Sequence, residues 1–300
     1  MKDVKVVISD LDGTLLLSNS QIGAFSEIII KKLTKENKKF IIATGRSKNE
    51  IISLTEHLNS HVSFFITLNG ARVYNNQWQL ISSYDLSSEI VNEILNLREN
   101  KYKDIPHFLQ KSEDIDERLY ADNITKNAIN NIFKKHKLLR KHKYIEHELK
   151  DISIKYHEIN SFTEIKNFNN IAKILLLHDE ETQLIKYEAT ILEKYRREIN
   201  AYLSTPHSLE IVNNKVSKGS ALKDILKSIH INLNEAIAFG DGFNDVDMLE
   251  NVNKGLLMGN ANYRLKKMLS YLEIIGTNDN EAVAHYINDN ILEEPVQHRT

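Results

Sequence analysis

The 300-residue sequence contains no cysteine, which excludes disulfide bonds, zinc sites built on thiolates and cysteine nucleophiles. It also lacks an excess of either charge, because 39 lysines and arginines stand against 41 aspartates and glutamates. A net charge of −2 argues against non-specific binding to nucleic acid, which normally goes with a basic excess. The absence of cysteine is compatible with a reducing compartment, and we expect a cytoplasmic protein.

Long apolar runs are missing as well. Runs such as Ile174–Leu177 fall far below the roughly 20 residues that a membrane-spanning helix needs. The first residues, Met1–Ile8, hold no apolar stretch long enough for a signal peptide. We therefore expect no membrane span and no leader. The 41% of hydrophobic residues are ordinary for a globular chain with a packed core.

Both ends of the chain alternate short apolar runs with amphipathic segments. Apolar residues recur at helical spacing between the runs, and Ser47 with Glu50 has the spacing of a capping box. The polar residues 75–77 predict a hairpin. Strands alternating with helices predict an α/β fold with a doubly wound sheet. The predicted buried strands are Val4–Ile8, Phe40–Ala43, Phe64–Thr67, Ala236–Phe239 and Leu256–Met258.

The middle of the chain breaks this pattern. It is richer in polar stretches and has no glycines at strand ends, and it contains a predicted strand at Ile171–Leu177 and a predicted helix at Leu184–Tyr195. This pattern predicts an α+β unit, and the segment is as long as a typical domain. Because the α/β pattern stops and restarts, we expect a core of residues 1–84 and 213–300 with a domain of residues 85–212 inserted into it.

Acidic residues follow two of the predicted strands. Asp10 and Asp12 come directly after the first strand, and Asp241 and Asp245 follow the Ala236–Phe239 strand. For either group alone, a polar turn is the less favoured interpretation. In an open α/β sheet, however, the carboxyl ends of the strands meet at one edge, where the four carboxylates would repel each other. A hard divalent cation resolves this repulsion, and ligation by oxygen alone favours Mg²⁺ over zinc.

Two further segments suit an anion. Thr44 and Gly45 stand at a helix entrance, where a hydroxyl and a free N–H can hold a phosphate oxygen, although a plain turn also explains them. Lys218 begins a predicted helix, where the helix dipole disfavours a cation. A lysine at this place makes better sense if an anion lies beside it. The site is therefore complementary to a phosphoryl group.

In order and over nearly the whole chain, these motifs resemble those of the haloacid dehalogenase superfamily of phosphohydrolases, in its Cof-type branch. Asn69-Gly70-Ala71, Leu209-Glu210-Ile211 and Met258-Gly259-Asn260-Ala261 point to the same branch. The tail Ile274–Tyr286 is similar to the enterobacterial pyridoxal phosphate phosphatases. The resemblance implies a Rossmann-like core with a large cap inserted between the second and third motifs.

The resemblance also implies roles for single residues. Asp10 corresponds to the nucleophile and Asp12 to the general acid and base. Mg²⁺ would be held by a carboxylate oxygen of Asp10, the backbone carbonyl of Asp12 and the carboxylate of Asp241. Asp245 would orient Lys218 or the waters of the metal, or would itself be a ligand. The phosphate would contact the backbone N–H of Leu11, together with Thr44, Gly45, Lys218 and Asn244.

These roles predict a magnesium-dependent phosphatase that hydrolyses a small phosphorylated metabolite through an aspartyl-phosphate. Pyridoxal 5′-phosphate is the first substrate candidate and sugar phosphates are the next, while the oligomeric state stays open. A phosphomutase of the same superfamily is an alternative and would yield an isomerised product. A signalling module with an aspartate phospho-acceptor is another, but such modules are shorter and lack an inserted domain. A catalytically inactive binding protein would not need the complete motif set.

The inserted segment carries two further features. The basic run Lys134–Lys143 could steer an anionic substrate, but a solvated helix face is the favoured interpretation. His107, His136, His142 and His147 lack the spacing of metal ligands, and we expect all four at the surface.

Overall fold

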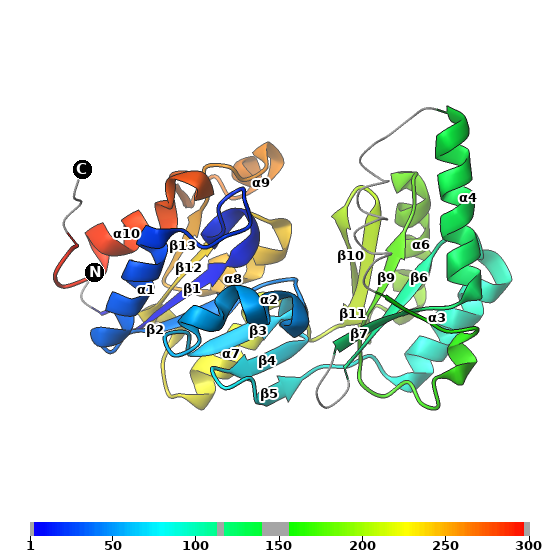
Figure 1. The fold of residues 1–300 in the computed structure, drawn as a ribbon, viewed down its shortest axis with the longest axis horizontal. Helices are drawn as coiled ribbons and strands as arrows, with labels where there is room; N and C mark the ends of the chain where they lie inside the picture. Colours follow the sequence, from blue (N-terminus) through cyan, green and yellow to red (C-terminus); the bar gives the residue numbers. More distant parts are fainter. Residues whose placement is uncertain (1–2, 113–116, 140–155, 297–300) are drawn as a thin grey trace. The chain divides into compact units, whose positions relative to one another are not determined.

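The computed structural model describes residues 3–112, 117–139 and 156–296, and the chain divides into two compact units (Figure 1). The first unit combines Met1–Ser83 with Val216–Thr300, and the second is Tyr84–Lys215. The chain therefore leaves the first unit once and returns to it. The sequence pattern predicts an insert of residues 85–212, and the second unit comprises Tyr84–Lys215.

The first unit is built on a sheet whose described strands follow the order β14-β13-β12-β1-β2-β3-β4-β5. Neighbouring strands from β14 to β3 are parallel, and the hairpin of β4 and β5 extends β3 in antiparallel fashion. The strand order reverses between β1 and β12, the point at which sheets of this kind bind ligands. The strands are β1 (Val6–Asp10), β2 (Lys39–Ala43), β3 (Phe64–Thr67), β4 (Arg72–Asn75), β5 (Leu80–Ser83), β12 (Ala236–Gly240), β13 (Lys254–Leu257) and β14 (Glu273–Ile274).

Helices cover both faces of this sheet. Side chains alternate along a strand, so Val7 and Phe40 pack into one hydrophobic cluster while Ile8 and Ile41 pack into the other. The first cluster includes residues of α1 (Ala24–Lys35), α2 (Lys48–Thr55) and α10 (Ala282–Asn290). The second includes residues of α7 (Lys218–Ser228), α8 (Val246–Asn251) and α9 (Tyr263–Met268). The predicted doubly wound α/β fold is confirmed.

The local predictions hold with small differences. Ser47 caps α2 in a capping box with Glu50, as predicted. The helical spacing of Ile51, Leu54 and Leu58 predicts a helix that reaches Leu58, but Leu58 lies beyond α2 in a short 3-10 turn. The hairpin is present, but Trp78 lies in its turn rather than in its second strand, with a φ of 60°. The indole ring stacks on Phe65, with 4.2 Å between the ring centroids, so packing on the core decides its position.

The second unit has its own sheet, with the described strands in the order β10-β11-β9-β6-β7-β8. Its pairs are antiparallel except β7 with β8. The strands are β6 (His107–Ser112), β7 (Glu117–Ala121), β8 (Tyr156–Glu158), β9 (Ile171–Leu177), β10 (Ile199–Thr205) and β11 (Ser208–Asn213). One hydrophobic cluster joins the sheet to α3 (Ser88–Lys101) and α6 (Glu181–Tyr195), and another joins it to α4 (Asn123–Leu139). This is the expected α+β unit.

The expectation that His107 lies at the surface is wrong. Its side chain is fully buried, with Nδ1 2.8 Å from the carbonyl oxygen of Ile105 and Nε2 2.9 Å from the hydroxyl of Tyr187. His107 stands two residues before Leu109 in β6, so the two side chains lie on the same face of the strand and His107 faces the apolar cluster that contains Leu109. Burial lowers the pKa of His107 to about 3. The side chains of His136, His142 and His147 lie outside the described residues.

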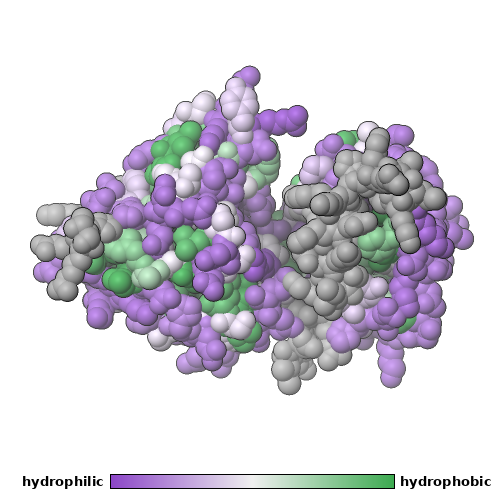
Figure 2. Space-filling model, turned by 45° about the horizontal axis from the view of Figure 1, so that its top comes forward, coloured by the Kyte–Doolittle hydropathy of each residue, from purple (hydrophilic) through white to green (hydrophobic). Residues whose placement is uncertain are grey.

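One face of the molecule is mainly polar among the described residues (Figure 2). Figure 2 shows a largely hydrophilic face on which hydrophobic residues form scattered patches. From the basic run, Lys134 is exposed, and Lys135 pairs with Asp179 at 2.8 Å and Glu180 at 2.9 Å. The side chains of residues 136–143 lie outside the described part. Among the described helices, none is long and apolar enough to cross a membrane.

Candidate active site

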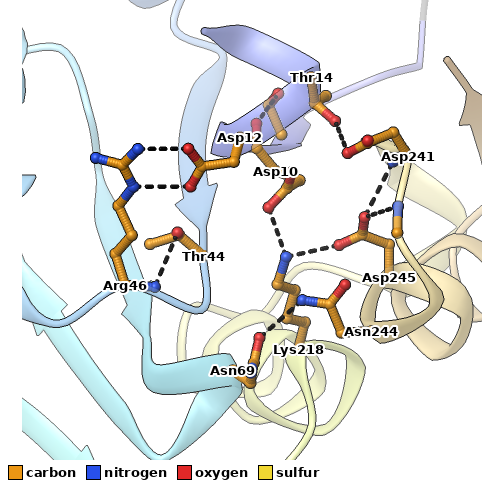
Figure 3. Close-up of polar contacts among 12 residues, drawn as sticks. Asp10, Asp12, Thr14, Thr44, Arg46, Asn69, Lys218, Asp241, Asn244 and Asp245 are labelled. Carbon is orange, nitrogen blue, oxygen red and sulfur yellow. Dashed lines mark hydrogen bonds and ion pairs between the residues drawn. The ribbon is translucent and has the colours of Figure 1, made fainter. Parts of the chain in front are cut away.

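Four segments of the first unit meet beyond the carboxyl ends of β1, β2 and β12 (Figure 3). Asp10 is the last residue of β1, and Asp241 directly follows β12, the neighbouring strand. Lys218 is the first residue of α7. The structure therefore brings Asp10, Lys218, Asp241 and Asp245 together at the point where the strand order reverses.

Lys218 is the centre of this group. Its amine donates hydrogen bonds to Oδ1 of Asp10 and Oδ1 of Asp245, both at 2.6 Å. The three residues are 1%, 5% and 0% exposed, respectively. Burial alone would lower the pKa of Lys218, but the charges of Asp10 and Asp245 outweigh it and raise that pKa well above its ordinary value. The lysine is therefore a fixed positive charge beside the proposed nucleophile.

The three carboxylates of Asp10, Asp241 and Asp245 carry more negative charge than Lys218 alone can neutralise. Oxygen atoms of Asp10, Asp241 and Asp245 lie within 4.8 Å of one another. Burial raises the pKa of Asp10 well above its ordinary value, and Asp245 and Asp241 add to the rise while Lys218 opposes it. Burial and the charge of Asp245 raise the pKa of Asp241 to about 6. A set of oxygen donors with surplus negative charge fits a hard divalent cation.

Asp245 also organises the loop after β12. Its Oδ2 accepts hydrogen bonds from the backbone N–H of Asp241 at 3.0 Å and of Gly242 at 2.9 Å, while Oδ1 holds Lys218. The same residue thus fixes the direction of Asp241 and of the lysine. Asp245 thus contacts Lys218, as an orienting residue would, and is also a member of the carboxylate cluster, so both roles that the resemblance implies for it stay predictions.

The turn after Asp10 is shaped by its contact with Asp241. Gly13 has a φ of +74°, and a Cβ at this position would lie 2.4 Å from Oδ2 of Asp241, so a side chain here would strain the backbone and displace the Asp241 carboxylate. Thr14 donates from its hydroxyl to Oδ1 of Asp241 at 3.1 Å. The turn and the β12 loop are therefore held against each other.

Asp12 does not join the carboxylate cluster. Its two oxygens accept from Nε of Arg46 at 2.8 Å and from Nη2 at 2.5 Å. Figure 3 shows the Asp12 side chain directed towards Arg46, whereas Asp10 is directed towards Lys218. The Asp12 side chain is 52% exposed and that of Arg46 29%. For Asp12 to transfer a proton, its carboxylate must turn away from the guanidinium of Arg46.

The loops that are predicted to contact phosphate include a residue to which the sequence motifs assigned no role, Asn69. Its Oδ1 accepts from the Asn244 amide at 2.9 Å, and its backbone N–H donates to the Thr44 carbonyl at 3.0 Å. A Cβ on Gly45 would lie 3.1 Å from the same Oδ1. Asn69, which is 5% exposed, therefore lies between the predicted phosphate contacts of β2 and of the β12 loop. The side chain of Leu11, another predicted phosphate contact, is fully buried.

A sequence model of haloacid dehalogenase-like hydrolases matches residues 7–287 of this chain. The chain belongs to the haloacid dehalogenase-like hydrolases. The match spans both parts of the first unit and the inserted unit. The polar cluster at the reversal of the strand order is therefore the candidate active site of a hydrolase.

Relatives of this hydrolase agree with that assignment. A Buchnera aphidicola protein named "Putative phosphatase" is 34% identical over 96% of each chain. The HMP-PP phosphatase of Serratia proteamaculans is 27% identical over 93% of this chain and 92% of its own. A haloacid dehalogenase-like hydrolase from Bacteroides thetaiotaomicron shares the fold, with a TM-score of 0.74, 24% identity and coverage of 95% and 98%. The narrower resemblance to pyridoxal phosphate phosphatases is not supported by these three proteins.

Two residues of the site, Arg46 and Asn69, were assigned no contact from the sequence. Arg46 follows Thr44 and Gly45, and a guanidinium one strand away from Asp12 is a signal that a carboxylate partner is near. Asn69 has a φ of 57°, a left-handed conformation that asparagine adopts more readily than most residues. The sequence signal for such a turn is Asn69-Gly70, which follows the predicted strand Phe64–Thr67.

Proposed function

We propose that this haloacid dehalogenase-like phosphatase hydrolyses small phosphate monoesters through a covalent phosphate on Asp10. The observation that supports this best is the buried Lys218, 2.6 Å from Asp10 at the reversal of the strand order. A carboxylate is a poor nucleophile towards a phosphate dianion because their like charges repel. A fixed cation beside both groups lowers that barrier.

The reaction we propose has two steps. A carboxylate oxygen of Asp10 attacks phosphorus, the bond from phosphorus to the leaving oxygen breaks, and Asp12 gives that oxygen a proton. A water molecule then attacks the same phosphorus and loses a proton to Asp12, and the bond to Asp10 breaks to release inorganic phosphate. Asp12 serves in both steps, and it must turn from Arg46 to do so.

We propose Mg²⁺ as the cofactor. Asp10 and Asp241 would hold it through their carboxylates and Asp12 through its backbone carbonyl, and the crowding of three carboxylates within 4.8 Å supports a cation here. When bound, Mg²⁺ would neutralise charge on the phosphoryl oxygens. An all-oxygen donor set suits Mg²⁺ better than zinc.

The phosphoryl group itself would be held by residues from three segments. We propose that the amine of Lys218 and the amide of Asn244 contact its oxygens, and that Asn69 keeps that amide in place. The N-terminus of α7, which Lys218 begins, adds the positive end of a helix dipole. The remaining proposed contacts are the N–H of Leu11, the hydroxyl of Thr44 and the N–H of Gly45.

One assay tests this function directly. Release of inorganic phosphate is measured over a panel containing pyridoxal 5′-phosphate, several sugar phosphates and HMP-PP, each with Mg²⁺ and with EDTA. We expect release from at least one small phosphate ester, with Mg²⁺ only. Release from none of them would contradict the proposed function, and release in EDTA would contradict the proposed cofactor. Isomerised product without free phosphate would indicate a mutase.

A further inference from the structure

Three side chains near the C-terminus hold the backbone of the segment that follows the proposed nucleophile. The amide of Asn260 donates to the carbonyl of Gly13 at 2.7 Å, and the amide of Asn278 donates to the carbonyl of Leu16 at 2.8 Å. Asp279 accepts from both the N–H and the hydroxyl of Ser18 at 2.7 Å. We call Asn260, Asn278 and Asp279 the C-terminal brace.

The C-terminal brace is itself anchored to the sheet. Oδ1 of Asn260 accepts from the backbone N–H of Asn278 at 3.1 Å, so the two amides form one connected unit. Next to them, Gly259 donates its N–H to the carbonyl of Gly276 at 2.8 Å. Asn278 is only 8% exposed, and its contact with Leu16 is buried. A buried amide bonded to a buried carbonyl holds its geometry more firmly than one that competes with water.

The braced segment needs support from outside because it has no regular structure. Asp12 and Gly13 have non-helical backbone angles, with φ values of −79° and 74°. The turn closes with a hydrogen bond from the N–H of Leu16 to the carbonyl of Leu11 at 2.8 Å. Beyond Asp12, the brace contacts this turn at the carbonyl of Gly13 and, at its end, at the carbonyl of Leu16.

The turn carries Asp12, the proposed proton donor and acceptor. In the same turn, the hydroxyl of Thr14 donates to Asp241. The other proposed phosphate contacts, among them Thr44, Lys218 and Asn244, come from different segments. A movement of the turn beyond Asp12 would therefore displace the Asp12 side chain while leaving the contacts of Thr44, Lys218 and Asn244 in place.

We propose that the C-terminal brace consists of positioning residues that keep Asp12 within reach of the leaving oxygen. This inference rests on the proposed function. Its consequence is a dependence on the leaving group, because an alkoxide needs a proton to depart and a nitrophenolate does not. Loss of the brace should thus impair the hydrolysis of alkyl phosphates more than that of p-nitrophenyl phosphate, whereas a general loss of folded protein would impair both equally.

The test compares kcat/KM for an alkyl phosphate that the enzyme accepts and for p-nitrophenyl phosphate. In Asn278→Ala and Asn260→Ala we expect a loss of about tenfold for the alkyl ester, and of less than about threefold for the nitrophenyl ester, as suits one or two lost hydrogen bonds. Asn260 is exposed, so its variant keeps the core intact. Asn290→Ala is the matched control, because this amide donates to the carbonyl of Tyr286 at 3.0 Å, away from the turn.

A second measurement does not depend on activity. Hydrogen exchange of the backbone amides of residues 11–18 should become faster in both brace variants and stay unchanged in Asn290→Ala. Equal losses on the two esters, or unchanged exchange of the turn, would overturn the role of the brace while the phosphatase activity stands. If the unaltered protein released phosphate from no ester, the proposed function would fail first, and the catalytic role of the brace with it.

Discussion

The amine of Lys218 lies 2.6 Å from Oδ1 of Asp10, and both side chains are almost completely buried. The two residues are far apart in the sequence, and each stabilises the charge of the other. Asp10 keeps a buried lysine charged, and Lys218 provides the positive charge that a phosphate dianion needs. The pair gives the first prediction.

Replacement of Lys218 by methionine should lower kcat/KM for phosphate esters by about 10²–10³-fold, the usual cost of removing one electrostatic contact from a transition state. Lys223→Met is the control, because Lys223 lies exposed on the same helix. Phosphate release by both purified variants, compared at equal folded fraction by circular dichroism, checks the prediction. Similar activity of the two variants would show that Lys218 does not contribute to the reaction.

The ion pair of Asp12 with Arg46 gives a second prediction. Asp12→Ala should lower kcat by about 10²–10⁴-fold, the range of a general acid and base contribution. Arg46→Met should cost less, since Arg46 acts through Asp12. In a double-mutant cycle, adding Arg46→Met to Asp12→Ala should then cost nothing further. Additive losses would mean that Arg46 serves the reaction independently of Asp12.

Metal removal gives a third prediction. EDTA should abolish phosphate release, and added Mg²⁺ should restore it. Mg²⁺ should also raise the melting temperature of the unaltered protein, because a ligand that binds only the folded state stabilises it. Asp241→Asn removes one carboxylate from the cluster and should lose this stabilisation. An equal rise in both proteins would place the cation elsewhere.

His107 gives a fourth prediction, about stability and pH. Its pKa in the folded chain is lowered from 6.5 to about 3. Above pH 6.5 the folded and unfolded chains are both neutral at this residue, and below it the unfolded chain alone takes up the proton. The free energy of unfolding should therefore fall as the pH drops from 6.5 towards 3, by at most about 1.4 kcal/mol per pH unit from this residue.

Urea unfolding of the unaltered protein and of His107→Gln at several pH values checks this. The variant keeps a polar side chain for Tyr187 and Ile105 but has no group that titrates. Its free energy of unfolding should decline less steeply between about pH 6.5 and pH 5. If the two proteins declined in parallel, burial of a neutral His107 would be contradicted.

The sequence alone predicted the parts of the structure that depend on short-range patterns. Alternating apolar runs and amphipathic helices predict parallel strands, and parallel strands bring Asp10 and Asp241 to one edge without knowledge of any contact. The class of the fold and the gathering of the acidic motifs follow from this. Ser47 and Glu50 are close in sequence, and their capping box was equally predictable.

Side-chain pairing between distant segments could not be predicted in this way. Asp12 was expected to face the leaving group, but its carboxylate is held by Arg46, 34 positions away. The burial of His107 depends on which face of β6 packs on the core. The one signal in the sequence was the apolar Leu109 two residues later, because it lies on the same face of the strand. Asn69 owes its place to a left-handed turn, which the sequence Asn-Gly permits but does not require.

The central claim is that Asp10 carries the phosphoryl group, and one measurement tests it most directly. The enzyme is mixed with a substrate labelled in its phosphate, quenched in acid within one turnover and separated from small molecules. The account predicts labelled protein whose label is released by hydroxylamine, as for an acyl phosphate, and no label in a folded Asp10→Asn variant. Phosphate release by the unaltered enzyme without any labelled protein, or normal turnover by Asp10→Asn, would contradict it.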